Sequence, residues 1–458
     1  MRASSANGAA VYPQRRSNPA LQAQLRLAHP GLLPAGTARI LAIAVSTLGI
    51  ALMLISLRPF AAASIFESSS ADGDALNQMG FLAAGAICLL ALISLANKKA
   101  LASLFTPSFV ALGLLIAVNV AQAPDPESTL RSAIFTIIGM LLAFSVIVLP
   151  RGEGDFRFAL LIGAGAALGL SYIGVLLFPN LALHGFDVYE PQHAGLWRGH
   201  FSHKNIAGPV MSIIAFFGLY IMRSGQRLAG LIMFSAATIF VLHTGSKTTT
   251  GFFPIAIMIV LLAPLFHRSS VAIFATLVTM ATVAIFTLGS LYSTEISQLV
   301  GDFLGDQTYT GRTTLWEVSL SKIPEHPWFG FGMYNFWMTD NVLGLDKPFE
   351  AAWDYRHIVH GHNNYLDILL NFGFIGGALV YWVLFIGPMF NYARARRLPG
   401  NRKLADMFFM IIVFACLLSF IETFFLARNV PLWLMHIFAV FGLHLLARFD
   451  IGRSLPDH

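Results

Sequence analysis

Long apolar runs recur along the whole chain of 458 residues, and they restrict its fold more than any other feature. A helix needs about 20 apolar residues to cross roughly 30 Å of hydrocarbon, and runs of this kind occur about twelve times. They lie near residues 40–57, 79–97, 101–122, 132–150, 158–178, 205–222, 228–243, 251–266, 270–291, 366–390, 405–425 and 432–447. With 56% hydrophobic and 11% charged residues, the composition differs from that of ordinary soluble domains. The sequence therefore predicts an all-α polytopic membrane protein with about twelve transmembrane helices.

The distribution of Lys and Arg between the loops predicts the orientation. With the N-terminus inside, the short inner loops carry Lys98, Lys99, Arg151, Arg157, Arg223, Arg227, Arg268, Arg394, Arg396, Arg397, Arg402 and Lys403. The short outer loops carry only Arg58, Arg131, Arg198, Lys204, Lys247 and Arg428. Because basic residues favour cytoplasmic loops, we expect both termini to be cytoplasmic. The formal net charge of +6 is then mainly a signal of topology, and we expect no nucleic-acid partner.

These spans divide the chain into five parts. We expect a cytoplasmic tail at 1–38, transmembrane helices 1–9 over 39–291, a large outer loop over 292–365, transmembrane helices 10–12 over 366–447 and a cytoplasmic tail at 448–458. The first apolar run is long enough to span and lies far from the start, so we expect an uncleaved helix rather than a signal peptide. Cys88 and Cys416 both fall inside apolar runs, so we expect no disulfide.

The large outer loop has a helix signal of its own. Thr310 is a candidate N-cap for a helix that ends at Lys322, before two prolines. The following segment, 328–332, is typical of a turn flanked by aromatic rings. Its Gly-x-Gly is no dinucleotide fingerprint, because no strand precedes it. The tryptophans of the loop suit either an interfacial aromatic belt or a surface for sugars; they are Trp316, Trp328, Trp337 and Trp353.

Three arginines on the expected outer side stand where a span or a helix begins or ends. They are Arg131, Arg198 and Arg312. An arginine at the centre of a membrane helix costs roughly 2.5–3.5 kcal/mol, so such residues either contact lipid phosphates at the rim or serve function. The planar guanidinium fork suits the oxygens of a phosphate or diphosphate. Lys247 is a further candidate for phosphate contact, or simply part of a short polar turn.

A polar segment from His360 to Asp367 leads into the tenth apolar run. His362 is the best candidate for a general base, since imidazole titrates near neutral pH. The polar residues that follow it could orient its ring, although a lone histidine is more often structural. His360 and His362 could instead bind a metal, but two histidines without a third ligand are a weak signature, and we expect no metal site.

In their order along the chain, these segments resemble the O-antigen ligase and Wzy-type O-antigen polymerase superfamily, particularly its exopolysaccharide-production branch. The matching segments are Trp197-Arg198-Gly199, His203-Lys204-Asn205, Ser246-Lys247-Thr248, Gly311-Arg312-Thr313-Thr314-Leu315-Trp316, Pro327-Trp328-Phe329-Gly330-Phe331-Gly332 and His362-Asn363-Asn364-Tyr365-Leu366-Asp367, followed by Gly373, Gly376 and Gly377. Each segment is short, but the ordered set is fairly specific and covers most of residues 40–447.

The resemblance implies a GT-C-like fold in the bacterial inner membrane, with one large periplasmic loop between helices 9 and 10 and an active site facing the periplasm. It implies a metal-independent glycosyltransferase without a cofactor. Its partners would be an undecaprenyl-diphosphate-linked oligosaccharide, an acceptor glycan, membrane lipids and a chain-length regulator. Arg198 and Arg312 would hold the diphosphate, and His362 would activate the attacking hydroxyl. The other substrate-binding positions would be Arg131, Lys247, His203, Lys204, Asn205, Trp316, Asn363 and Tyr365.

Two other functions stay open at this stage. A ligase would differ only in its acceptor, which would be the lipid A core instead of another lipid-linked repeat. We favour a polymerase because the Trp-Arg-Gly and His-Lys-Asn segments resemble the exopolysaccharide branch. A flippase for the same lipid-linked sugar would also suit about twelve spans. A transporter, however, would place charged residues or broken helices near the midplane, whereas these candidates lie at outer helix ends.

Overall fold

The computed structural model describes residues 33–55, 59–60, 75–186, 191–266, 268–345, 354–428 and 430–450. Within these residues the chain is helical, and the only strand-like pairing is an isolated bridge between Leu183 and Trp197. The prediction of an all-α protein is therefore confirmed. Predictions for most of the two tails, for Arg58 and for Trp353 lie outside the described residues.

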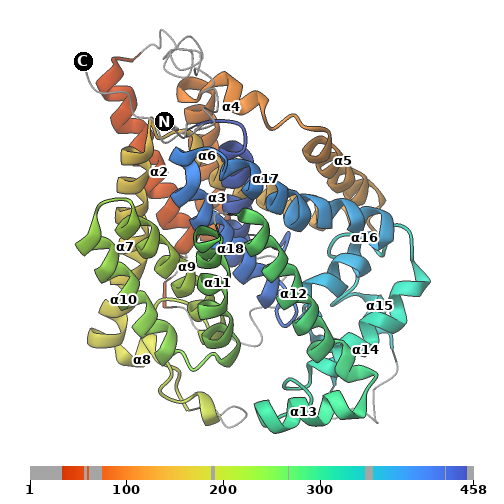
Figure 1. Ribbon diagram of the computed structural model, residues 1–458. Helices are drawn as coiled ribbons and strands as arrows, with labels where there is room; N and C mark the ends of the chain where they lie inside the picture. Colours follow the sequence, from red (N-terminus) through yellow and green to blue (C-terminus); the bar gives the residue numbers. More distant parts are fainter. Residues whose placement is uncertain are drawn as a thin grey trace, which may run out of the picture.

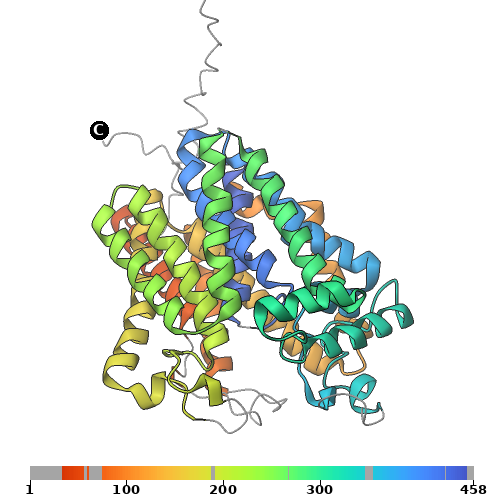
Figure 2. The ribbon, with the colours of Figure 1, turned by 60° about the horizontal axis from the view of Figure 1, so that its bottom comes forward.

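The long helices run back and forth between two ends of the molecule, as Figures 1 and 2 show. They are α2 (Ala35–Leu54), α3 (Ala75–Leu95), α5 (Pro107–Gln122), α6 (Pro126–Val148), α7 (Glu153–Leu177), α9 (Lys204–Arg223), α10 (Arg227–His243), α11 (Lys247–Leu265), α12 (Ser269–Thr287), α16 (Asn364–Tyr381), α18 (Arg402–Leu418) and α19 (Pro431–Leu446). A π-helical turn, Trp382–Ile386, continues α16 into α17 (Gly387–Ala395). The short helices α4 (Lys98–Ala102) and α8 (Pro179–Ala182) lie at opposite ends of the bundle.

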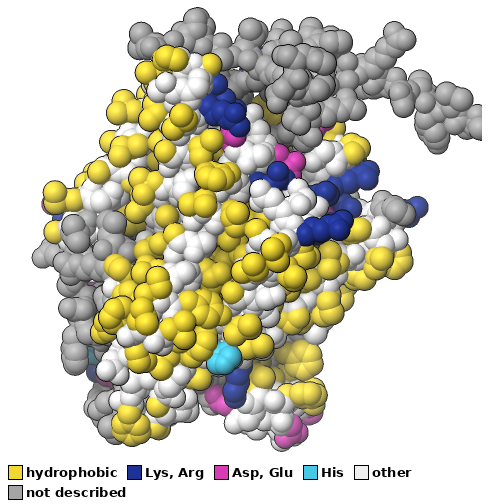
Figure 3. All heavy atoms as spheres, turned by 90° about the vertical axis from the view of Figure 1, so that its left-hand side faces the viewer, with side chains coloured by type: hydrophobic (Ala, Val, Ile, Leu, Met, Phe, Trp, Pro, Cys, Tyr) yellow, Lys and Arg dark blue, Asp and Glu magenta, His cyan; other side chains and the backbone are white. Residues whose placement is uncertain are grey.

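The chain is a polytopic membrane protein. In its described part, eight helical stretches are long and apolar enough to cross a membrane. The other predicted spans correspond to the shorter helices α5, α10, α18 and α19, so the number twelve stays a prediction. In Figure 3, hydrophobic side chains cover the middle of the visible face, and most of its Lys and Arg side chains lie toward the upper end. This pattern is the one expected for a bundle surrounded by hydrocarbon.

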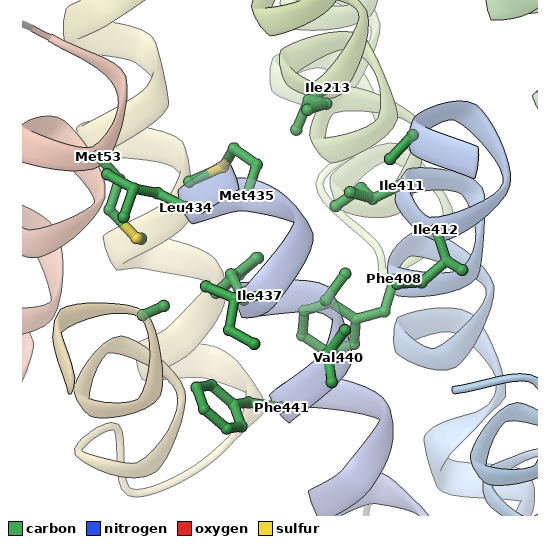
Figure 4. Close-up of a cluster of buried hydrophobic side chains, with 14 of the residues drawn as sticks. Met53, Ile213, Phe408, Ile411, Ile412, Leu434, Met435, Ile437, Val440 and Phe441 are labelled. Carbon is green, nitrogen blue, oxygen red and sulfur yellow. The ribbon is translucent and has the colours of Figure 1, made fainter. Parts of the chain in front are cut away.

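Helices α18 and α19 lie in the core of the bundle. Every residue of α19 from Leu432 to Leu446 is buried, as is typical of a helix that is apolar on all sides. Figure 4 shows how side chains from several helices gather here, among them Met53 of α2, Phe408 of α18 and Val440 of α19. The loops at the ends of these helices are therefore carried by a closely packed core.

The predicted outer loop contains the helices α13 (Thr294–Leu304), α14 (Arg312–Lys322) and α15 (Asp340–Leu343), which lie at the lower right of Figure 1. The predicted helix thus ends at Lys322 as expected. The predicted N-cap, Thr310, is wrong. Gly311 occupies the cap position with a φ of 81°, and Thr310 itself has a φ of 62°. The carboxylate of Asp306 accepts the N–H of Thr310 and holds this turn from outside the helix.

Helix α16 is interrupted at Gly373, which has a φ of 62° and a ψ of −166°. The loop after α14 satisfies the backbone groups that the break exposes. Four hydrogen bonds of 2.7–3.1 Å do so, from the N–H of Phe331 to Leu370, Gly332 to Asn371, Phe374 to Pro327 and Ile375 to Trp328. A Cβ on Gly373 would lie 2.4 Å from the backbone of this loop, so glycine is required. The aromatic turn predicted at 328–332 therefore connects the segment after α14 to α16 through backbone hydrogen bonds.

Candidate active site

Three segments that are far apart in the sequence meet at Glu422, in the turn after α18. One carboxylate oxygen, Oε1, accepts a hydrogen bond from Arg312 Nη2 at 2.8 Å. The other, Oε2, lies 3.1 Å from His362 Nδ1. The three side chains are partly buried, with exposed fractions of 17–27%. Arg312, which we predicted to hold the diphosphate, and His362, which we predicted to be the base, therefore contact the same carboxylate. The sequence analysis did not assign Glu422 to the site.

The electrostatics of this group favour an ionised Glu422. Burial acts to raise the pKa of Glu422, but the charge of Arg312 and the hydrogen bond from His362 outweigh it and lower the pKa to about 2. The carboxylate is therefore negative near neutral pH. A negative acceptor beside Nδ1 favours the tautomer that carries its proton there, which leaves the lone pair on Nε2 of His362.

His362 has an unusual backbone conformation, with a φ of 51°. A left-handed φ is uncommon for a residue other than glycine and is often found at functional sites. The neighbouring residues impose it. The N–H of Gly361 donates to the Asp367 carboxylate at 3.0 Å, and Asn363 caps α16 on the other side. The position of the imidazole is therefore fixed by the start of the helix.

Asn363 and Asn364 fasten the start of α16 to the turn that carries Glu422. Asn363 is fully buried; its Oδ1 accepts two N–H groups of the first helical turn, and its Nδ2 donates to the carbonyl of Phe420 at 3.1 Å. Asn364 Oδ1 accepts the N–H groups of Phe424 and Phe425 at 2.9 and 3.0 Å. We predicted a substrate contact for Asn363. In this structure its amide forms hydrogen bonds with backbone groups, and the substrate contact stays a prediction.

Asp367 completes this attachment one turn further along α16. Its carboxylate accepts hydrogen bonds from Trp337 Nε1 at 2.8 Å and from the Thr423 hydroxyl at 2.6 Å, in addition to the N–H of Gly361. Thr423 follows Glu422 directly, and Gly361 precedes His362. One buried carboxylate therefore holds the backbone next to His362 and the side chain next to Glu422 in fixed positions.

Two aromatic residues with predicted substrate contacts pack against other rings of the protein. Trp316 has an exposed fraction of 0%, and its ring packs against Tyr309 with 5.3 Å between centroids. Tyr365 packs against Phe420, and its hydroxyl donates to the carbonyl of Cys416 at 2.9 Å. In this structure Trp316 is buried and Tyr365 is half-buried, and both rings pack within the protein. Their contact with substrate stays a prediction.

The loop between α8 and α9 brings three imidazoles together. The ring centroids of His184, His193 and His203 lie 4.8–5.8 Å apart. His203 Nδ1 accepts the N–H of Asn205 at 3.1 Å and so caps α9. Burial and neighbouring cations lower the pKa of His184 and of His203 to about 4, while Glu422 acts to raise that of His203. His203 thus lies within electrostatic reach of the group at Glu422. Across the described residues, no set of three or more His, Cys, Asp or Glu side chains is arranged to hold a metal ion.

The predicted cations of this loop point into the protein. Arg198 and Lys204 are each 7% exposed. The guanidinium of Arg198 donates to the carbonyl of Phe201 at 2.9 Å and, at 3.5 Å, to those of Leu183 and Ser202. Burial lowers the pKa of Arg198. Its visible contacts therefore shape the loop, and its contact with a diphosphate stays a prediction.

The two remaining predicted cations have partners elsewhere. Lys247 Nζ donates to the carbonyl of Leu304 at 3.2 Å, which ties the start of α11 to the end of α13. Arg131 lies 3.4 Å from Glu127 in the same helix. Arg428 is an outer-loop cation that the sequence analysis did not assign to the site. It follows Glu422 in the loop between α18 and α19 and donates from Nε to Ser132 at 2.9 Å.

Comparison with known proteins supports the resemblance seen in the sequence. Residues 229–381 match the family model described as O-Antigen ligase, a region that contains Arg312 and His362 but not Arg198 or Glu422. The exopolysaccharide production protein ExoQ of Rhizobium meliloti (strain 1021) is 29% identical over 99 residues, which cover 20% of this chain. The match spans 22% of the length of that relative. Together with the ordered segments and the helical membrane fold, these matches support the resemblance to the O-antigen ligase and polymerase superfamily.

Proposed function

We propose that this protein is a polysaccharide polymerase of the bacterial inner membrane, which transfers a glycan from undecaprenyl diphosphate to an acceptor sugar. The observation that carries the proposal is the carboxylate of Glu422, which holds a guanidinium at 2.8 Å and an imidazole at 3.1 Å. Charge stabilisation and general-base catalysis are the two functions that such a transfer requires. The family match and the printed name of the relative, an exopolysaccharide production protein, support this choice.

The proposed reaction uses the two partners of Glu422 on opposite sides of the donor sugar. Nε2 of His362 takes the proton of the acceptor hydroxyl while its oxygen attacks the anomeric carbon. The bond from that carbon to the diphosphate oxygen breaks, and its electron pair leaves with the lipid diphosphate. Arg312 stabilises the charge that develops on this leaving group, so the scheme requires no metal ion. Glu422 stabilises the imidazolium that forms.

The charge distribution supports an active site on the periplasmic side. The described basic residues of the expected inner loops all belong to the loops at the end of the bundle that carries α4, whereas Glu422 lies in a turn at the opposite end. By the positive-inside rule, the end with α4 faces the cytoplasm. The helices α13 to α15 and the group at Glu422 then face the periplasm, where the lipid-linked donor would be met.

A reconstituted assay tests the proposal. The full-length protein in lipid nanodiscs is supplied with undecaprenyl-diphosphate-linked oligosaccharide, and the products are separated by size. We expect a ladder of longer lipid-linked glycans, formed without nucleotide sugars and in the presence of a chelator. Transfer onto added lipid A core without a ladder would identify a ligase. In liposomes, movement of intact donor across the bilayer without transfer would identify a flippase.

A further inference from the structure

A cavity lies at the end of the bundle away from Glu422. Its volume is about 330 Å³, and it is lined by the start of α5, by one side of the π-helical turn and α17, and by the last turns of α19. Arg394 and Arg448 both border it. The group at Glu422 lies at the start of α14, before α16 and after α18, and shares no residue with the lining of the cavity, so this cavity is separate from the candidate active site.

The two arginines present positive charge at the mouth of this cavity. Both side chains are exposed, and Arg448 Nη1 donates to the carbonyl of His444 at 2.9 Å. Both residues line the same cavity, and burial of part of the side chain, followed by the charge of Arg394, lowers the pKa of Arg448. Among the described residues, neither arginine forms a salt bridge. Two adjacent guanidinium groups without a carboxylate favour an anion between them.

The wall beside these cations is apolar and faces outward. Trp382 is 46% exposed and Phe390 is 55% exposed, and their ring centroids are 6.0 Å apart. Thr106 and Ser108, whose hydroxyls lie 3.3 Å apart, line the same cavity. Cations and hydroxyls next to exposed aromatic rings at the end of a membrane bundle are suited to a lipid headgroup, with its acyl chains along the rings.

We propose that this cavity binds the phosphate of an anionic phospholipid from the membrane leaflet opposite the candidate active site. Arg394 and Arg448 contact the phosphate, and Trp382 and Phe390 contact the acyl chains. Free inorganic phosphate would offer the same oxygens, but it has no chains to cover the two rings. The lipid would bridge α17 and α19, so its binding stabilises the folded bundle. This proposal does not depend on the reaction at Glu422.

The test uses the full-length protein in detergent, and its melting temperature is measured against added ligand. Short-chain phosphatidylglycerol is compared with phosphatidylcholine of the same chain length and with inorganic phosphate. We expect a saturable rise in melting temperature with phosphatidylglycerol only. An equal rise with inorganic phosphate would show a phosphate site and overturn the lipid proposal. An equal rise with phosphatidylcholine would show an apolar contact without anion recognition and would overturn it as well.

Two double variants distinguish binding in the cavity from attraction by the overall positive charge at this end of the bundle. The pair Arg394→Gln and Arg448→Gln should weaken phosphatidylglycerol binding by about tenfold or more, as expected for the loss of charge-assisted contacts. The pair Arg397→Gln and Lys403→Gln removes the same charge from exposed positions outside the cavity and is the matched control. Phe390→Ala should weaken binding of the lipid through its chains. Equal effects of the two double variants would overturn the proposal, because bulk charge would then suffice.

Discussion

His362 Nδ1 lies 3.1 Å from a carboxylate oxygen of Glu422, although 60 positions separate the two residues in the sequence. The same carboxylate also holds Arg312 through its other oxygen. Glu422 therefore acts through its neighbours: it fixes the proton of the imidazole on Nδ1 and holds the guanidinium beside it. We regard it as a positioning residue.

The first prediction concerns Glu422→Gln, which keeps the size of the side chain and removes its charge. We expect transfer to fall by about 10- to 100-fold, the usual effect of losing a group that orients a functional histidine. Glu422→Asp should recover part of the rate, since it restores the charge. Glu317→Gln, at an exposed position on α14, is the control and should be active. A fully active Glu422→Gln protein would rule out the positioning role.

The second prediction concerns the charge on the leaving group. Arg312→Ala should lose about 100-fold or more of the transfer rate, and Arg312→Lys should recover little, because an ammonium cannot reproduce the guanidinium fork. Rates are measured in the reconstituted assay at saturating donor. Arg356 is a matched control, since it belongs to the same outer segment and pairs with Asp354 at 2.7 Å. Near-normal rates for Arg312→Lys would mean that positive charge alone is sufficient.

The third prediction separates two neighbouring histidines. The rings of His360 and His362 are 4.3 Å apart, and burial together with His362 lowers the pKa of His360 to about 3. His360 therefore stays neutral and supports its neighbour. We expect His362→Ala to abolish transfer but still bind the lipid-linked donor, whereas His360→Ala keeps measurable activity.

An exposed histidine of the same segment, His357, supplies the control variant His357→Ala, which should behave as the unaltered protein. Binding is followed with a fluorescent donor, and transfer with the product ladder. If His360→Ala is as inactive as His362→Ala, the two rings act together and the choice between them is unsupported. If a chelator inhibits transfer and added zinc restores it, the histidines bind a metal ion and His362 is not a general base.

The fourth prediction concerns Arg198, whose guanidinium donates to backbone carbonyls of its own loop. Arg198→Ala leaves these carbonyls without their donor, so we expect a loss of about 1–3 kcal/mol in the free energy of unfolding. Thermal unfolding in detergent measures it. An unchanged melting temperature together with lost transfer would instead favour the direct diphosphate contact predicted from the sequence.

The sequence predicted the parts of the site that carry local signals. Arg312 opens a helix whose last residue, Lys322, is followed by prolines, and His362 lies directly before a capped helix, so both could be recognised. Glu422 was not recognised, because the apolar run predicted at 405–425 includes it. One signal was available: an ionisable residue within a membrane segment is usually functional.

Other errors have a tertiary origin. The sequence shows that the segment around Trp316 is aromatic, but not which side of the helix faces α16. The buried ring packs against Tyr309, and this contact depends on the three left-handed residues that precede α14. In the same way, Gly373 is conspicuous only after the turn at 328–332 is seen to pair with the broken helix. Such long-range pairings decide which polar and aromatic residues are available to substrate.

The fifth prediction is the dependence of stability on pH. The pKa of Glu422 is lowered to about 2 in the folded protein, against a usual value of 4.5 for an exposed glutamate, because Arg312 and His362 outweigh the effect of burial. The folded state therefore binds this proton less readily than the unfolded state does. Its contribution to stability is fully present above the unfolded value and is lost as the pH falls toward the folded one. Glu422→Gln has no such contribution at any pH.

We expect the difference in melting temperature between the unaltered protein and Glu422→Gln to be largest near pH 6 and to shrink between pH values of about 4.5 and 2. The measurement is thermal unfolding of both proteins in the same detergent, with Glu317→Gln as a reference for an exposed carboxylate. A difference that stays constant over this range would show that Glu422 is not held ionised by its two partners.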